Sequence, residues 1–192
     1  MEGNRLETDW ATKFNATTPE KLWVDYGRQE SPRNGGEYYC LTKNDFLALF
    51  RNQYWGLATV TLNDGTTKVK GIVFCPNSIT TESAAKAYLT KVHKFSSTVA
   101  ELSYPKYSEN AITQKKIDDN GLLFLPATGY RANGNVIGMV GSYGNYWSRT
   151  LTNTTNENGK LAYLCAWNEE SRLKVDDINN RFQGFAVRLA IK

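Results

Sequence analysis

A chain of 192 residues with an ordinary apolar content is long enough for one domain with a sizeable hydrophobic core. Its formal net charge of +4 is spread along the chain without a run of like charges, which favours a solvated, slightly basic surface over a nucleic-acid groove. No apolar stretch has the length of a membrane span, so no transmembrane segment is expected.

The first residues, MEGNRLETDW, lack the apolar region of a secretion signal. Either the protein is not exported by that route or a leader has been removed. Residues 1–37 are polar and end in the loop-like sequence ESPRNGGE. We expect them to be an N-terminal extension, either separate from the following domain or part of it. The domain itself is placed at 38–192.

A helix is predicted from about 43 to 52, because Thr42 is a good N-cap, Asp45 is close to completing a capping box, and an apolar stripe follows. Next, LATVTL at 57–62 and VKGIVFCP at 69–76 predict two strands, joined by an Asn-Asp-Gly turn into a β-hairpin. Residues 77–107 are expected to be loop-rich, with room for one helix. Ser108 is then expected to cap a short helix, ENAITQKKIDD, which Asn120 and Gly121 terminate.

The remaining chain predicts strands. GLLFLPATGYR, from Gly121, is expected to be a buried strand broken by Pro126, followed by a glycine-rich turn region. YWSRT, LAYLCAW and GFAVRLAIK predict three further strands, with LTNTTNENGK at 151–160 as a mobile loop. The fold class is therefore α+β, with two short helices packed on a mostly antiparallel sheet with long loops.

The cysteines and the histidine give little sign of metal or redox chemistry. Cys40, Cys75 and Cys165 are far apart, and an odd number cannot pair completely. Buried free thiols are favoured, with one disulfide and one free thiol as the alternative. His93 is the single histidine and stands alone, so neither a metal site nor a cofactor is expected.

A set of motifs occurs in a recognisable order: LTKNDFLALF, GIVFCP, GLLFLPATGYR, GSYGNYWSRT, AYLCAW and RFQGFAVRL. This set resembles the C-type-lectin-like domains of gut Bacteroidetes and their phages, which include "major paralogous" surface domains and the variable proteins of diversity-generating retroelements. The resemblance covers about 38–192, and its specific part is 121–189. It implies a C-type-lectin-like fold of the branch related to formylglycine-generating enzymes.

The resemblance also implies a function for 141–192, which corresponds to the variable region of such proteins and would display diversified side chains on a stable frame. The implied frame positions are Gly141, Gly144, Trp147, Ser148, Arg181, Gly184, Phe185, Val187 and Arg188. The implied display positions, which would contact the ligand, are Tyr143, Asn145, Tyr146, Arg149, Leu151, Leu164, Ala166, Arg172, Lys174, Ile178, Phe182 and Gln183.

Some of these side chains can be placed from the strand period. Trp147, Trp167 and Phe185 are expected in the core. Leu164 and Ala166 would then point outwards, because successive strand residues face opposite ways. Whether Tyr143, Tyr146, Arg149 and Phe182 serve contact or packing stays open.

Cysteine catalysis and calcium binding are two alternatives to simple ligand binding. The enzymes that this family resembles use a pair of reactive cysteines, whereas this C-terminal region has only Cys165, without a histidine nearby. The calcium-lectin triplets Glu-Pro-Asn and Gln-Pro-Asp are absent, and Trp167-Asn168-Glu169 is a weak match to a third lectin motif. Asp118-Asp119 and Asp176-Asp177 are expected to be solvated helix ends or turns. We therefore expect no enzyme activity, while calcium dependence stays open.

The sequence thus predicts a non-enzymatic ligand- or receptor-binding protein. Its partner would be a protein or a glycan on a cell or phage surface, because a wide, flat site suits a macromolecule better than a metabolite. A place on the cell surface or the virion follows from the same resemblance. The alternative is a non-diversified cell-surface or pilus-tip adhesin of the same family, and an enzyme of the formylglycine-generating type ranks third.

Overall fold

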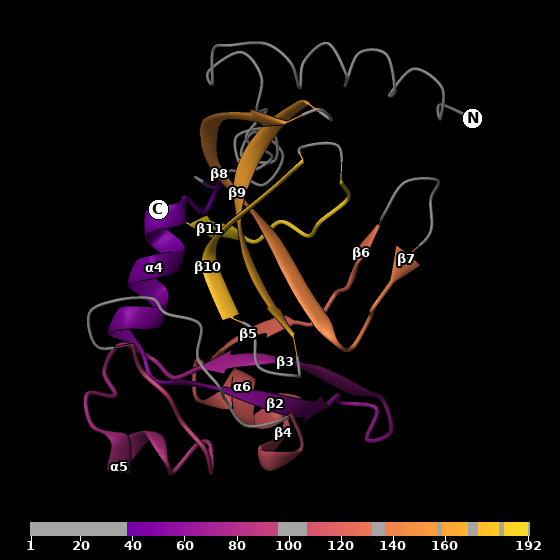
Figure 1. Cartoon of the computed structure of the whole chain (residues 1–192). Coiled ribbons are helices and arrows are strands. Elements are labelled where there is room, and N and C mark those ends of the chain that lie inside the picture. The colour runs from indigo at the N-terminus through magenta and orange to yellow at the C-terminus, as the bar shows by residue number, and fades with distance from the viewer. Residues whose placement is uncertain are drawn as a thin grey trace.

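The computed structural model describes residues 38–95, 107–131, 137–156, 159–168, 173–180 and 183–191. Within these ranges the strands form a four-stranded sheet, a three-stranded sheet and two two-stranded pairs, with few helices (Figure 1). Most strand pairs are antiparallel, so the α+β class is confirmed. The predictions on residues 1–37, Arg172, Arg181 and Phe182, and on the side chain of Leu151, lie outside the described part.

Helix α4 (Lys43–Asn52) has the predicted bounds and the predicted start. The Thr42 side chain accepts the Asp45 N–H, and the Asp45 carboxylate accepts the Thr42 N–H at 2.8 Å, which completes a capping box. Phe46 and Phe50 are fully buried. Through this apolar face α4 packs beside strands β8, β9 and β10 (Figure 1).

The predicted hairpin is confirmed as β2 (Trp55–Thr61) and β3 (Lys68–Phe74), which pair in register from Trp55↔Phe74 to Thr61↔Lys68. The Asp64 carboxylate accepts the backbone N–H groups of Thr66 and Thr67, which fixes the turn. Strand β5 (Leu123–Pro126) pairs with β3, and the short β4 (Ala111–Thr113) runs parallel to β2. The sheet order is therefore β4-β2-β3-β5.

The helix predicted from Ser108 is wrong in its first half. A 3₁₀ turn (Tyr107–Glu109) and strand β4 precede helix α6 (Gln114–Asp119), and Thr113 is the N-cap. Asn110 decides the difference, because its buried side chain bonds the Leu57 and Lys91 carbonyls and the Lys91 N–H. These bonds hold the segment against β2, so it pairs as a strand. The insertion contains one described helix, α5 (Glu82–Ala85).

A second sheet carries the C-terminal region. It consists of β8 (Tyr143–Asn156), β9 (Gly159–Asn168) and β10 (Leu173–Asn180) in the order β10-β9-β8. The mobile loop predicted at 151–160 is wrong, because β8 and β9 extend through it on both sides of residues 157–158. Strand β10 was not predicted. Its sequence, LKVDDINN, is too polar to show an apolar strand pattern.

Two short strand pairs complete the fold. Strand β1 (Tyr38–Cys40) pairs with β11 (Leu189–Ile191), so the two ends of the described chain lie side by side. Strand β6 (Tyr130–Arg131) pairs with β7 (Ile137–Gly138) in a hairpin that stands beside β8 (Figure 1). No helix of the described residues is long and apolar enough to cross a membrane.

The main core lies between α4, the β4-β2-β3-β5 sheet and one face of the β8–β10 sheet. We call the β4-β2-β3-β5 sheet the hairpin sheet. Phe50 makes edge-on ring contacts with Trp55 and Phe74 at centroid distances of 5.2 and 4.9 Å. The three cysteines are buried and free, as predicted. This core determines which face of the β8–β10 sheet remains for other contacts.

Candidate binding pocket

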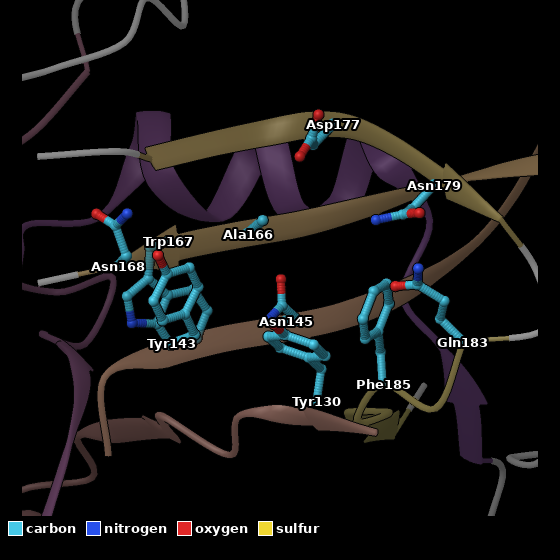
Figure 2. A pocket seen from close by; sticks show the side chains of 10 residues that line it. All are labelled: Tyr130, Tyr143, Asn145, Ala166, Trp167, Asn168, Asp177, Asn179, Gln183 and Phe185. Atoms are coloured by element: carbon cyan, nitrogen blue, oxygen red, sulfur yellow. The ribbon is translucent and has the colours of Figure 1, made fainter. Parts of the chain in front are cut away.

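A pocket of about 260 Å³ opens on the face of the β8–β10 sheet that points away from α4 and the main core. We call this side of the sheet the pocket face and the other side the core face. Figure 2 shows the side chains that line the pocket. They are Tyr130, Tyr143, Asn145, Ala166, Trp167, Asn168, Asp177, Asn179, Gln183 and Phe185.

The alternation of strand residues explains which side chains reach the pocket. On β8, Tyr143 and Asn145 face the pocket, and they pair with Asn168 and Ala166 of β9. Residues directly opposite in an antiparallel pair share a face, so these four lie together. The intervening Gly144 and Trp167, and the next pair, Tyr146 and Cys165, lie on the core face, where all four are buried. One face of the sheet therefore belongs to the main core, and the other face contributes to the pocket.

A β-bulge in β10 brings an acidic side chain to the pocket. Lys174 pairs with Ala166, whereas Asp177 pairs with Leu164, so β10 contains one extra residue between them. Without the bulge Asp177 would face the core, because a one-residue shift moves a side chain to the opposite face. Asp177 and Asn179 consequently line the pocket. The turn expected at Asp176-Asp177 is wrong, because both residues lie in β10, although Asp176 is exposed as expected.

The opposite wall of the pocket comes from β6 and from residues 183–186. The Arg131 and Gly184 backbones exchange two hydrogen bonds of 2.8 and 3.0 Å. The Trp147 N–H donates to the Ala186 carbonyl at 2.9 Å, and its indole N–H donates to the Gln183 carbonyl at 3.1 Å. Residues 183–186 are thus hydrogen-bonded to both β6 and β8, so the rings of Phe185 and of Tyr130 on β6 are held in position.

Behind the pocket stands an aromatic stack. The rings of Tyr146 and Trp167 are nearly parallel, with an interplanar angle of 6° and centroids 5.4 Å apart. The Trp167 indole N–H donates to the Tyr107 hydroxyl at 3.0 Å, and the Tyr146 hydroxyl donates to the Pro126 carbonyl at 2.8 Å. Gly144 lies against the Trp167 ring and leaves no room for a Cβ. The pocket therefore has a rigid back wall whose polar groups are satisfied.

The structure brings together four of the twelve predicted display positions: Tyr143, Asn145, Ala166 and Gln183. Lys174 lies on the pocket face by register, beside Ala166. Arg149 is exposed, but it does not line the pocket. Ile178 faces the other way, because it pairs with Tyr163, whose ring lies 4.2 Å from the Lys43 ammonium of α4.

Two display positions, Tyr146 and Leu164, are corrected to core positions, and two more, Asn145 and Ala166, are also buried, with 7% and 6% exposure, although they line the pocket. Tyr146 is 3% exposed and belongs to the aromatic stack. Leu164 is 1% exposed, and the prediction that Leu164 and Ala166 are exposed is wrong. Their direction away from Cys165 and Trp167 is correct, but Trp147 and Phe185 cover Leu164 and Ala166 in a second cluster. The strand period predicts which face of the sheet a side chain points to, but it does not predict whether other residues cover that face.

The implied frame also divides into two groups. Gly144, Trp147 and Ser148 are buried, and Phe185 packs on Trp147 with ring centroids 4.7 Å apart. Trp167 is buried as predicted, although its ring edge reaches the pocket. Val187 and Arg188 are exposed, so nothing in the described contacts gives them a packing role.

Four pocket residues were missed by sequence reasoning: Tyr130, Asn168, Asp177 and Asn179. Asp177, Ile178 and Asn179 alternate between polar and apolar side chains, which is a strand pattern. The bulge between Lys174 and Asp177 interrupts this pattern. Tyr130 reaches the pocket only because β6 pairs with β7 beside the sheet. That juxtaposition leaves no sequence signal.

The polar groups that line the pocket are mostly uncharged. Asp177 alone carries a formal charge among the ten described lining residues, and the other polar groups are amides and tyrosine hydroxyls. Burial raises the pKa of the Cys165 thiol strongly, and this side chain is 0% exposed, so its reactive thiolate is disfavoured. His93 bonds through its backbone to Trp55 and packs on that ring, and burial lowers its pKa.

Comparison of the chain with protein-family models, with curated proteins and with solved structures finds no match.

Proposed function

We propose that the protein is a non-enzymatic ligand-binding protein with a C-type-lectin-like fold, and that the pocket face of its β8–β10 sheet is the binding surface. The ligand is a macromolecule on a cell or phage surface, and the protein itself acts at a cell surface or on a virion. The binding residues are Tyr130, Tyr143, Asn145, Asp177, Gln183 and Phe185, which combine broad aromatic contact with polar groups that orient a ligand.

One observation carries this proposal. Side chains from β6, β8, β9, β10 and residues 183–186 converge on one concave site, although they come from positions between 130 and 185. Each wall has a backbone held by hydrogen bonds to a neighbouring strand. A site built in this way is preorganised, so little ordering entropy is lost when a ligand binds.

The burial of Tyr146 and Leu164 favours a second candidate, the fixed adhesin. Diversification at these two positions would introduce polar or mis-sized residues into packed clusters, which destabilises a fold by several kcal/mol. A diversified surface would therefore be limited to display positions that are not buried, such as Tyr143, Arg149, Lys174 and Gln183. The fixed adhesin has no such restriction.

Binding is tested with one variant inside the pocket and one matched variant outside it. Tyr143→Ala removes a half-buried pocket ring, and Tyr88→Ala removes a half-buried ring that packs beside the hairpin sheet. Both proteins are screened with the wild type on arrays of extracellular proteins and of glycans. We expect a ligand that Tyr143→Ala loses and Tyr88→Ala keeps. Equal binding by both variants would place the site elsewhere.

Sequencing codons 141–192 across a population separates the two candidates. A diversified protein shows substitutions confined to adenine positions in codons such as 149, with the codons of Trp147, Leu164 and Gly144 unchanged. A uniform sequence, or changes scattered over all bases, identifies the fixed adhesin.

A further inference from the structure

Asn145 is the one buried polar residue among the described residues that line the pocket, with 7% exposure. Figure 2 shows its side chain in the middle of the lining side chains, between those of Tyr143 and Phe185 in this view. The Asn145 carboxamide makes no hydrogen bond to another described residue. A polar group that has lost most of its water without gaining a partner is unfavourable, and a ligand that supplies the missing bonds removes this penalty. The position of Asn145 therefore indicates a ligand site.

The other lining side chains whose polar groups make no hydrogen bond within the described part of the chain are also uncharged. They are the Gln183 carboxamide and the hydroxyls of Tyr130 and Tyr143. Three further polar lining residues already interact with another residue, so a ligand would have to compete for them: Asn168, Asp177 and Asn179. The groups that are open to a ligand thus favour an uncharged partner group.

The Asn145 carboxamide discriminates between ligand groups by the bonds that each can offer. An ammonium or guanidinium group only donates, a carboxylate only accepts, and a hydroxyl has both functions on a single atom. A carboxamide has a donor and an acceptor side by side in one plane, so it can pair with both polar atoms of Asn145 at once. We propose that the pocket binds the Asn or Gln side chain of a protein partner. This inference rests on the proposed function and names the chemistry of the ligand.

Three aromatic rings provide walls for the flat carboxamide and its apolar stem. The ring centroid of Tyr130 lies 6.4 Å from that of Tyr143 and 6.4 Å from that of Phe185, with interplanar angles of 71° and 85°. The walls therefore stand nearly at right angles, and all three line the same pocket. The pocket volume of about 260 Å³ lies below the range of about 300–1,000 Å³ that is typical of sites for whole small molecules. It suits one side chain of a larger ligand.

The surroundings of the pocket favour a protein over a glycan. Ile137, Met139 and Val140, which we call the apolar turn, are 69%, 52% and 66% exposed. The apolar turn adjoins the pocket residues, because the Tyr143 N–H donates to the Met139 carbonyl at 2.9 Å and Tyr130 pairs with Gly138. Neighbouring hydroxyls of a sugar can also pair with a carboxamide, but a polar sugar leaves the apolar turn uncovered. A protein covers it and excludes water around the buried contact.

The backbone of the apolar turn is fixed, although its side chains are exposed. The Gly141 N–H donates to the Ala127 carbonyl at 2.8 Å, and a Cβ on Gly129 would overlap the backbone of residues 138–140. Met139 has φ 58° and is the single described non-glycine residue with positive φ. This conformation strains a residue that has a Cβ, and such strain is frequent at ligand sites. The structure thus holds an exposed apolar side chain in a strained position beside the pocket.

The test uses a random linear peptide library displayed on phage and selected on the intact protein. Selected peptides are synthesised and measured by isothermal titration calorimetry against the wild type and its variants. Asn145→Leu keeps a side chain of similar shape without the carboxamide, and Met139→Gly removes part of the apolar turn. Asn77→Leu makes the first change at an exposed position after β3 and is the matched control. A melting curve for each variant shows that it is folded.

We expect the selected peptides to share an Asn or Gln. Replacement of that residue by leucine, or by the corresponding acid, should weaken binding at least about tenfold. Asn145→Leu should weaken binding about five- to hundredfold, which corresponds to leaving one buried polar group unpaired. Its melting temperature should stay the same or rise, because an unpaired polar group is replaced by an apolar one, whereas an Asn145 that held the pocket together would lower it. Asn77→Leu should bind as the wild type does.

Met139→Gly should weaken binding about two- to tenfold, because part of the apolar contact is lost. Its melting temperature should stay close to that of the wild type, since relief of the strain offsets the larger backbone entropy that glycine loses on folding. Unchanged binding by Met139→Gly would refute the contact with the apolar turn.

Other outcomes overturn the carboxamide and show whether the proposed function survives. Peptides that depend on a charged residue instead, or that bind Asn145→Leu unchanged, refute the carboxamide pair and leave a binding pocket in place. A neutral glycan that Tyr143→Ala loses, without any pocket-dependent peptide, refutes the protein partner in the same way. If neither peptides nor glycans depend on the pocket, the proposed function fails as well.

Discussion

Replacing Gly144 by alanine is the sharpest test of the wall behind the pocket. A Cβ built on Gly144 overlaps the six-membered ring of Trp167. That ring cannot move aside easily, because it is buried, stacked on Tyr146 and bonded through its indole N–H to the Tyr107 hydroxyl. The methyl group therefore forces either the stack or the β8–β9 pairing to shift.

The expected cost follows from these contacts. Overpacking a close-packed site costs about 1–3 kcal/mol, and disturbing the stacked rings and the indole hydrogen bond adds about 1 kcal/mol. Alanine recovers roughly 0.5–1 kcal/mol of the backbone entropy that glycine loses on folding. The free energy of unfolding should therefore fall by about 1–3.5 kcal/mol. For a chain of this size, at about 2–4 °C per kcal/mol, the Tm falls by about 2–14 °C.

Gly138→Ala is the matched control, because nothing lies within 4 Å of a Cβ at Gly138. This variant should match the wild type or gain up to about 0.5 kcal/mol from reduced unfolded-state entropy. Both variants are measured by urea unfolding followed by tryptophan fluorescence and by calorimetry. If Gly144→Ala and Gly138→Ala have the same stability, the aromatic stack is not the rigid wall described, and the argument for a preorganised pocket is refuted.

Three further predictions concern the rest of the domain. Asn110→Ala should lower the free energy of unfolding by about 2–4 kcal/mol in urea titrations, because it leaves the buried Leu57 carbonyl and the Lys91 carbonyl without this donor. Asn77→Ala at an exposed position should change the same free energy by less than about 0.5 kcal/mol. Thr42→Ala should lower the free energy of unfolding by about 1 kcal/mol, because it removes half of the capping box, whereas Thr42→Ser should leave it almost unchanged. Equal losses of unfolding free energy in the two variants would show that the cap does not hold α4. Burial raises the pKa of Cys75 from 9.0 to about 11, so its contribution to stability is complete below pH 9.0 and is lost as the pH rises to about 11. Unfolding titrations over this interval should show a weaker pH dependence for Cys75→Ala, and an unchanged slope would contradict the burial effect.

Local patterns determined the elements whose causes lie within a few residues. The capping box at Thr42 and Asp45 defines the start of α4, and the Asp64 turn defines the β2–β3 hairpin. Both depend on hydrogen bonds between residues two or three apart, so the sequence displays the whole cause. The free, buried state of the cysteines was also foreseen from their number and spacing.

Tertiary contacts determined the remaining elements and most of the pocket. The segment after Asn110, which was predicted as part of a helix, forms strand β4 because the Asn110 side chain bonds to Leu57. A bulge in β10 directs Asp177 towards the pocket. The period of β9 gives the direction of Leu164 correctly, but only the position of Trp147 and Phe185 shows that it is covered. Tyr130 joins the pocket from another strand pair. Burial and convergence depend on what packs across a sheet, and a one-dimensional pattern does not contain that information.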